Sequence, residues 1–178
     1  MNWQTCAKLF TLLALLCSIF PPTTRAKQED LPSYILPEHR LILQKWLQQR
    51  PYLRPATEQD TDSPEALKLV REGYTGKPFQ AFYAVADFNH DGQKDFAIGF
   101  VNRKRPKDMA LAVFNGPFGK RRASVPAFYH ETRFGLSDFL ILVGDRWDQL
   151  QIGTGSDAHT VLLKPKRGGY YIWEGATQ

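Results

Sequence analysis

Oxygen-bearing side chains alternate along one short stretch of the chain, residues 87–95, which reads Asp-Phe-Asn-His-Asp-Gly-Gln-Lys-Asp. Asp87, Asn89 and Asp91 occupy its first, third and fifth positions, where the side chains of a calcium loop donate oxygens to the ion. Gly92 follows at the sixth position, where such a loop turns sharply. Because Ca²⁺ takes about six to eight oxygen ligands, this spacing predicts a calcium site.

Two further ligands complete the predicted site. Gln93 donates its backbone carbonyl at the seventh position, and Asp95 closes the site at the ninth, directly or through a water molecule. A standard EF-hand joins two helices and has a bidentate Glu at the twelfth position, which is Ile98 here. The flanking residues are instead rich in β-branched and aromatic side chains. The loop is therefore expected to connect two β-strands.

Residues 82–101 resemble a repeat of the FG-GAP or VCBS type, in which a D-x-[DN]-x-D-G-x-x-D loop joins two strands and holds calcium. Members of that family usually have several repeats that build propeller blades, whereas this chain has one copy. The resemblance therefore implies a single strand-loop-strand unit and a calcium ion. A hairpin turn without metal is the alternative, because Asp-Gly between apolar runs is a strong turn signal. A turn alone does not explain the acids at both Asp87 and Asp95.

The amino terminus has the layout of a secretory signal peptide. Lys8 precedes an apolar run, and a small-residue exit at Ala26 follows it. The run has about twelve residues, fewer than the roughly 20 that a membrane-spanning helix requires. We therefore expect residues 1–26 to be removed and the protein to be exported, to the periplasm or out of the cell, without a stable membrane span. A lipoprotein anchor at Cys17 is the alternative, although Leu16 precedes it where such sites have a small residue.

Removal of this leader changes the chemistry that the chain offers. Both cysteines, Cys6 and Cys17, lie within it, so residues 27–178 have no disulfide, no thiol nucleophile and no cysteine-bound zinc. The basic count falls from 23 to 21 against 18 acidic residues, and the formal net charge falls from +5 to +3. This mild charge does not indicate nucleic-acid binding. Outside the cytosol, millimolar calcium fills sites with dissociation constants of about 10⁻⁴ to 10⁻³ M.

Residues 27–178 have the length of a single domain, and two helices are expected in its first part. One helix opens at Pro37 and stops before Pro51. The second helix has Ser63 as its N-cap and ends at Gly73. The residues between the two helices are polar and are expected to form a loop.

From Pro78 onward, short apolar and aromatic runs alternate with Gly, Pro or charged residues, which predicts strands. The expected strands are residues 79–87, 95–102, 108–115, 127–131, 139–143, 149–153, 160–164 and 170–173. The short connections favour antiparallel pairing, because parallel strands need longer crossovers. The predicted architecture is α+β, a curved antiparallel sheet with the two amino-terminal helices packed on one face.

Two other sets of residues allow different functions. Ser156, Asp157 and His159 lie within four residues of one another and allow an exported hydrolase, although one loop seldom aims all three members of a catalytic triad. The basic run Arg103–Lys107 allows a protein-interaction or inhibitor factor that binds an acidic, extracytoplasmic protein. The hypothesis that the loop favours is a small, exported, non-enzymatic module. In it, calcium bound by Asp87–Asp95 orders a connection between strands.

Overall fold

The computed structural model describes residues 31–61, 63–73, 79–119, 125–132, 140–143, 150–153 and 161–173. All of them belong to one unit, Leu31–Gln178. The predicted leader, with Cys6 and Cys17, lies outside the described residues. None of the described helices is long and apolar enough to cross a membrane.

Helix α2 (Pro37–Gln48) begins at a proline, whose fixed φ suits the first turn and whose missing N–H needs no partner there. Glu38 in the first turn and Lys45 in the last complement the helix dipole. The buried side chains of this helix, Leu43 and Trp46 among them, recur at helical spacing. The predicted helix is therefore confirmed, and it presents one apolar face.

Helix α3 (Pro64–Gly73) also begins at a proline, and Ser63 caps it by accepting a 3.4 Å hydrogen bond from the backbone N–H of Ala66. Leu67 is its buried residue. A single 3₁₀ turn, η1 (Glu58–Asp60), precedes it, so the segment between the two helices is more ordered than the polar sequence indicates.

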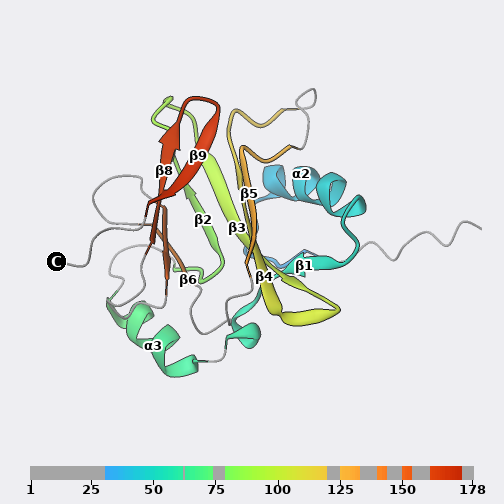
Figure 1. The fold of residues 1–178 in the computed structure, drawn as a ribbon, viewed down its shortest axis with the longest axis vertical. Helices are drawn as coiled ribbons and strands as arrows, with labels where there is room; N and C mark the ends of the chain where they lie inside the picture. Colours follow the sequence, from blue (N-terminus) through green and yellow to red (C-terminus); the bar gives the residue numbers. More distant parts are fainter. Residues whose placement is uncertain are drawn as a thin grey trace, which may run out of the picture. The chain divides into compact units, whose positions relative to one another are not determined.

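The first sheet is built around β3 (Asp95–Asn102), the longest buried strand. Two short strands, β1 (Leu53–Pro55) and β2 (Tyr83–Ala86), pair with the same edge of β3 at different levels. On its other edge β3 pairs with β4 (Arg105–Phe114), and β4 pairs with β5 (Phe128–Thr132). All these pairs are antiparallel, so β3 has hydrogen-bonded neighbours along both edges (Figure 1).

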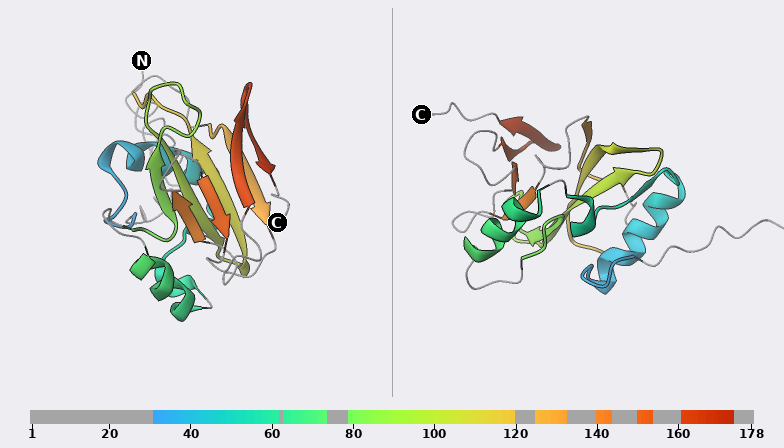
Figure 2. Two further views of the ribbon diagram at one scale, coloured as in Figure 1. Left: turned by 90° about the vertical axis from the view of Figure 1, so that its left-hand side faces the viewer. Right: turned by 90° about the horizontal axis from the view of Figure 1, so that it is seen from below.

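The second sheet follows in chain order. Its strands are β6 (Leu140–Val143), β7 (Leu150–Gly153), β8 (Val161–Lys166) and β9 (Gly169–Trp173), and each pairs antiparallel with the next. A tight turn joins β8 to β9, which lie side by side in Figures 1 and 2. The α+β class with antiparallel pairing is thus confirmed, and the strands are divided between two sheets.

Alternate side chains of β3 enter two different apolar clusters. Phe96 and Ile98 pack with Trp46 of α2 in one cluster. Ala97 and Val101 point to the opposite face and pack in the other cluster, to which β7, β8 and β9 also contribute. Successive side chains of a strand point to opposite faces of the sheet. Every residue of β3 is buried, on one face or the other. The first sheet is therefore covered on both sides.

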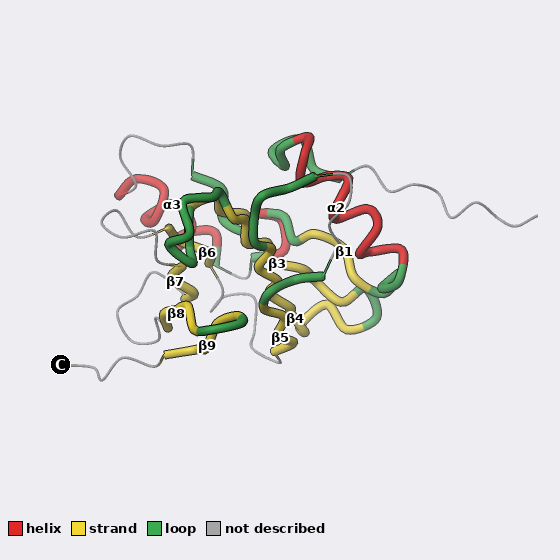
Figure 3. Tube along the Cα trace, turned by 90° about the horizontal axis from the view of Figure 1, so that it is seen from above, coloured by secondary structure: helices red, strands yellow, loops and turns green. Residues whose placement is uncertain are grey.

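The structure places the helices differently from the expectation that both pack on one face. Helix α2 covers one face of the first sheet, whereas Leu67 of α3 packs in the cluster on the opposite face, with the second sheet. Figure 3 shows α2 and the second sheet on opposite sides of β3 and β4. Helical periodicity identifies the apolar side of a helix but not the sheet face that this side covers. The sequence did not indicate that the strands divide into two sheets, so the face that α3 covers could not be predicted.

Most strand boundaries fall within a few residues of those expected, and β3 matches them at both ends. Strand β2 is shorter than predicted, because residues before Tyr83 form a turn. Strand β1 was not predicted, since it has only three residues, ends at a proline and lies in a polar segment. Its partner is Phe100–Asn102 of β3, which supplies the pairing that the local sequence does not indicate.

Acidification is expected to destabilise this fold through His39, a buried residue of α2. Its Nδ1 lies 2.6 Å from the Tyr83 hydroxyl, and its ring stacks on Phe96 with centroids 4.1 Å apart. Burial lowers the pKa of His39 from 6.5 to about 4. Between these pH values the unfolded chain binds a proton that the folded chain does not. Stability is therefore fully present above pH 6.5 and falls toward about pH 4, by on the order of 2 kcal/mol.

Urea unfolding at about pH 7 and about pH 4.5 measures this effect. His39→Gln removes the titrating group and should flatten the pH dependence, whereas substitution of the exposed His130 by Gln should leave it unchanged. Equal pH dependence in the two variants would contradict the assignment to His39.

Candidate functional site

The predicted loop joins β2 to β3, two strands that are antiparallel neighbours. Ala86 at the end of β2 pairs with Asp95 at the start of β3. Residues between them form a tight connection in which Asp91 to Lys94 are exposed. The strand-loop-strand arrangement expected from the flanking residues is therefore present in the structure.

Two side-chain oxygens of the loop converge on one backbone group. The N–H of Asp91 donates to Oδ1 of Asp87 and to Oδ1 of Asn89, both at 3.0 Å. The N–H of Gly92 donates to the second oxygen of Asp87 at 2.8 Å. These bonds turn the side chains at the first and third positions toward the interior of the loop.

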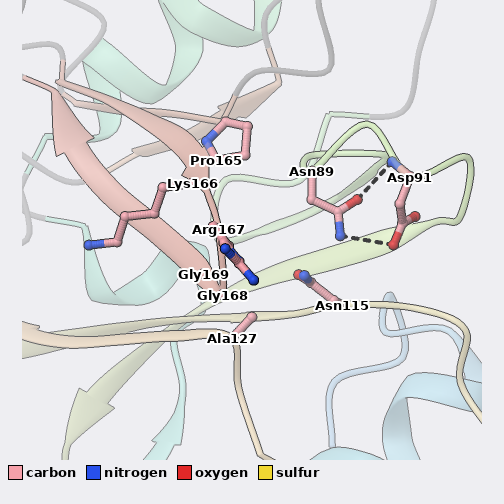
Figure 4. Close-up of a pocket in the computed structure, with 9 residues that line it drawn as sticks. All are labelled: Asn89, Asp91, Asn115, Ala127, Pro165, Lys166, Arg167, Gly168 and Gly169. Carbon is pink, nitrogen blue, oxygen red and sulfur yellow. Dashed lines mark hydrogen bonds between the residues drawn. The ribbon is translucent and has the colours of Figure 1, made fainter.

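The carboxylate of Asp91 lies beside the same group. Its Oδ2 accepts a 3.0 Å hydrogen bond from Nδ2 of Asn89 (Figure 4). Its Oδ1 accepts a 2.8 Å bond from the N–H of Gln93. Within the described residues, neither Asp87 nor Asp91 forms an ion pair with a Lys or Arg. The loop thus gathers two carboxylates and an amide, and its negative charge has no cationic side-chain partner there.

The backbone of the loop has two residues in the left-handed region. His90 has φ of 60° and Gly92 has φ of 84°. Gly92 has no atom within 4 Å of the position that a Cβ would take, so its φ rather than crowding favours glycine. His90 is exposed at the fourth position, as expected for a residue that faces away from an ion.

Asp95 has a different set of contacts from the other predicted ligands. It is fully buried, and its Oδ2 accepts hydrogen bonds from the N–H groups of Phe88 and Asn89 at 3.0 and 3.2 Å. Its Oδ1 accepts a 2.9 Å bond from the N–H of Gly116, and the hydroxyl of Tyr170 donates to Oδ2 at 3.2 Å. Three of these four donors bond to Oδ2 and one bonds to Oδ1. Asp95 therefore holds the loop against the core, and its oxygens do not lie on the exposed side of the loop.

The electrostatics of Asp95 agree with this structural role. Burial raises the pKa of its carboxyl, while the hydrogen bonds from Gly116, Asn89, Tyr170 and Phe88 oppose that rise by favouring the carboxylate. Burial and the nearby charge of Asp95 raise the pKa of Tyr170 as well, so its hydroxyl remains a donor. The same hydroxyl lies 2.8 Å from Oδ1 of Asn115, which extends the network to the residue after β4.

Sequence reasoning did not identify Asn115, Gly116 or Tyr170 as parts of this network. Gly116 and Tyr170 lie 21 and 75 residues from Asp95, and no local motif marks them. A Cβ at Gly116 would lie 2.3 Å from the carbonyl oxygen of Lys94, so the chain passes directly against the loop at this glycine. The pairing of β3 with β4, which brings Phe96 opposite Phe114, places Asn115 and Gly116 beside the start of β3. Tyr170 reaches Asp95 from β9 of the second sheet.

The described part of the chain has no group of three or more His, Cys, Asp or Glu side chains arranged to hold a metal ion. Of the three carboxylates in the predicted calcium set, Asp95 is turned into the core. Asn89 and the carbonyl of Gln93, the other predicted ligands, are not of these residue types. The second candidate set, Ser156, Asp157 and His159, lies outside the described residues.

The basic run Arg103–Lys107 is exposed, with its first two residues in the turn between β3 and β4. The rest of the run belongs to β4, which begins at Arg105. Arg105 forms a 2.8 Å ion pair with Asp108 in the same strand, so part of the positive charge is compensated locally.

Comparison with known proteins gives no relative of this chain. No family model matches it, and no curated protein or solved structure matches it either. The resemblance of residues 82–101 to an FG-GAP or VCBS repeat therefore stays a prediction, and function is inferred from the site itself.

Proposed function

We propose that this protein is a small, exported, non-enzymatic module in which calcium binds the loop between β2 and β3 and orders it. The observation that carries this proposal is the convergence of Oδ1 of Asp87 and Oδ1 of Asn89 on the backbone N–H of Asp91, whose carboxylate is bonded to the Asn89 amide. Neither carboxylate has a cationic side-chain partner among the described residues. Hard oxygen donors at this spacing suit Ca²⁺. The leader-like sequence of residues 1–26 supports export to a compartment where calcium is abundant.

The five predicted residues have two different tasks in this proposal. The side chains of Asp87, Asn89 and Asp91 and the carbonyl of Gln93 hold the ion, and water completes its coordination. Asp95 holds the loop against the core through its bonds to Phe88, Asn89, Gly116 and Tyr170. The ion therefore neutralises the negative charge on the exposed half of the loop. Hydrogen bonds to Asp95 hold the buried half without the ion.

Calcium is expected to raise the melting temperature of the mature protein. For a dissociation constant of about 10⁻⁴ to 10⁻³ M, about 10 mM calcium stabilises the folded state by roughly 1.4–2.7 kcal/mol. For a chain of this size the shift is several degrees. Differential scanning calorimetry in calcium and in EDTA measures it, and magnesium at the same concentration controls for ionic strength.

Asp91→Ala should abolish the calcium-dependent shift, because it removes one of the two exposed carboxylates of the site. Lys94→Ala is the matched control, since Lys94 is exposed in the same loop and its side chain is not a ligand. A wild-type melting temperature that is equal in calcium and EDTA, with no heat of binding by calorimetry, would refute the proposed function.

A further inference from the structure

A cavity of about 690 Å³ lies between the loop and the turn that joins β8 to β9. Asn89 and Asp91 line it on the loop side, Arg167 lines it on the turn side, and Asn115 lies between them (Figure 4). Its volume is in the range of sites that take small molecules. The cavity joins segments that are far apart in sequence, so no local motif indicates it.

Arg167 is one of two cationic residues that line the cavity, with Lys166. Within the described part of the chain it forms neither an ion pair nor a hydrogen bond. Figure 4 shows its guanidinium directed toward Asn89 and Asn115, whereas the ammonium of the neighbouring Lys166 points away from them. A guanidinium presents several donors in one plane and binds carboxylate or phosphate through two parallel bonds.

Asn115 adds further donors at the base of the cavity. Its Oδ1 lies 2.8 Å from the Tyr170 hydroxyl, and Nδ2 at the other end of the amide makes no hydrogen bond among the described residues. Gly168, with φ of 83°, and Gly169 follow Arg167 in the turn and have no side chains to fill the space. The cavity therefore has Arg167 and Asn115 as side-chain donors.

We infer that this cavity is a binding site for a small organic anion, whose carboxylate or phosphate group is held by Arg167 and by Nδ2 of Asn115. The amide of Asn89 and the backbone of the turn contact the polar remainder of the molecule. The lining has no aromatic side chain among the described residues, so hydrogen bonds and charge rather than stacking select the ligand.

Calcium should strengthen this binding, and this part of the inference rests on the proposed function. The carboxylate of Asp91 faces the same cavity and repels an anion when the loop is empty. An ion bound by the loop neutralises that charge and offers a positive centre on the side opposite Arg167. The affinity for the anion should therefore be higher in calcium than in EDTA.

Titrations followed by amide and side-chain NMR shifts test the inference, with D-glucuronate and glucose 6-phosphate as anionic probes and glucose as the neutral one. All samples have the same ionic strength. Saturable shifts at the side chains of Arg167 and Asn115 are expected with at least one anion, and about tenfold weaker binding with glucose. The preferred anion distinguishes a carboxylate site from a phosphate site.

Arg167→Ala should weaken anion binding at least about tenfold, and Lys166→Ala, which removes an equal charge from the same turn, should weaken it less than about threefold. Equal losses in the two variants, or no saturable shift with either anion, would overturn the inference. A separate calcium titration without anion reports on the proposed function. If calcium binds but neither anion does, the inferred anion site is wrong and the proposed calcium-binding function stands. If an anion binds at Arg167 but calcium does not bind, the proposed calcium-binding function is wrong and the anion site stands.

Discussion

Asp95→Ala is expected to destabilise the folded protein by about 3–5 kcal/mol, more than any other single change in the loop. The substitution removes the acceptor of three backbone N–H groups and of the Tyr170 hydroxyl from a fully buried position. Each buried donor left without an acceptor costs about 1–3 kcal/mol. The structure can relax partially and water can enter, so the expected loss of stability is smaller than the sum of the costs of the separate donors.

Urea unfolding in EDTA measures this loss without any contribution from calcium. Asp91→Ala serves as the matched control, because its carboxylate is exposed in the same loop, and we expect it to cost less than about 1 kcal/mol. Tyr170→Phe should cost about 1 kcal/mol, since one hydrogen bond is removed and the ring is retained. If Asp95→Ala were no more destabilising than Asp91→Ala, Asp95 would not have the structural role assigned to it.

Gly116→Ala is expected to cost about 2–4 kcal/mol, because the new methyl group meets backbone rather than a movable side chain. A Cβ at this position would lie 2.3 Å from the carbonyl oxygen of Lys94 and 3.2 Å from the Cβ of Gln93. Relief requires the loop and the segment after β4 to separate, which lengthens the 2.9 Å bond from the Gly116 N–H to Asp95. Overpacking of this kind typically costs about 1–3 kcal/mol, and the weakened hydrogen bond adds to it.

Gly119→Ala is the control for this variant, since no atom lies within 4 Å of the position of its Cβ. Thermal unfolding of both variants in EDTA gives the comparison, and calcium titration of Gly116→Ala shows whether displacement of Lys94 and Gln93 also weakens the ion site. A Gly116→Ala protein as stable as Gly119→Ala would contradict the close approach seen here.

The loop could be predicted from the sequence because its geometry is local. Asp87, Asn89 and Asp91 are bonded to backbone groups no more than five residues away, and Gly92 supplies the turn that such bonds require. The strand that follows, β3, was also placed correctly, since its run of apolar residues is continuous. Local spacing was thus sufficient to predict the strand-loop-strand arrangement, and calcium binding by the loop stays a prediction.

The buried half could not be predicted, because its partners are distant in the chain. The sequence suggested that Asp95 is a ligand by its position in the motif, and nothing near it indicates that Gly116 and Tyr170 donate to it. The burial of His39 was missed for the same reason: its partner Tyr83 lies 44 residues away, on β2. Which face α3 covers depends likewise on the second sheet.

The hydrogen bond between Tyr170 and Asp95 spans 75 residues, and this separation fixes an order of events during synthesis. A chain made from its amino terminus contains the complete loop sequence long before β9 exists. The nascent loop can form its short-range bonds, but Asp95 acquires its last donor only when the final strand has docked. Contacts of such long range also slow folding, because loop closure must precede them. The attachment of the loop to the core is therefore completed only after a residue made 75 positions later is in place.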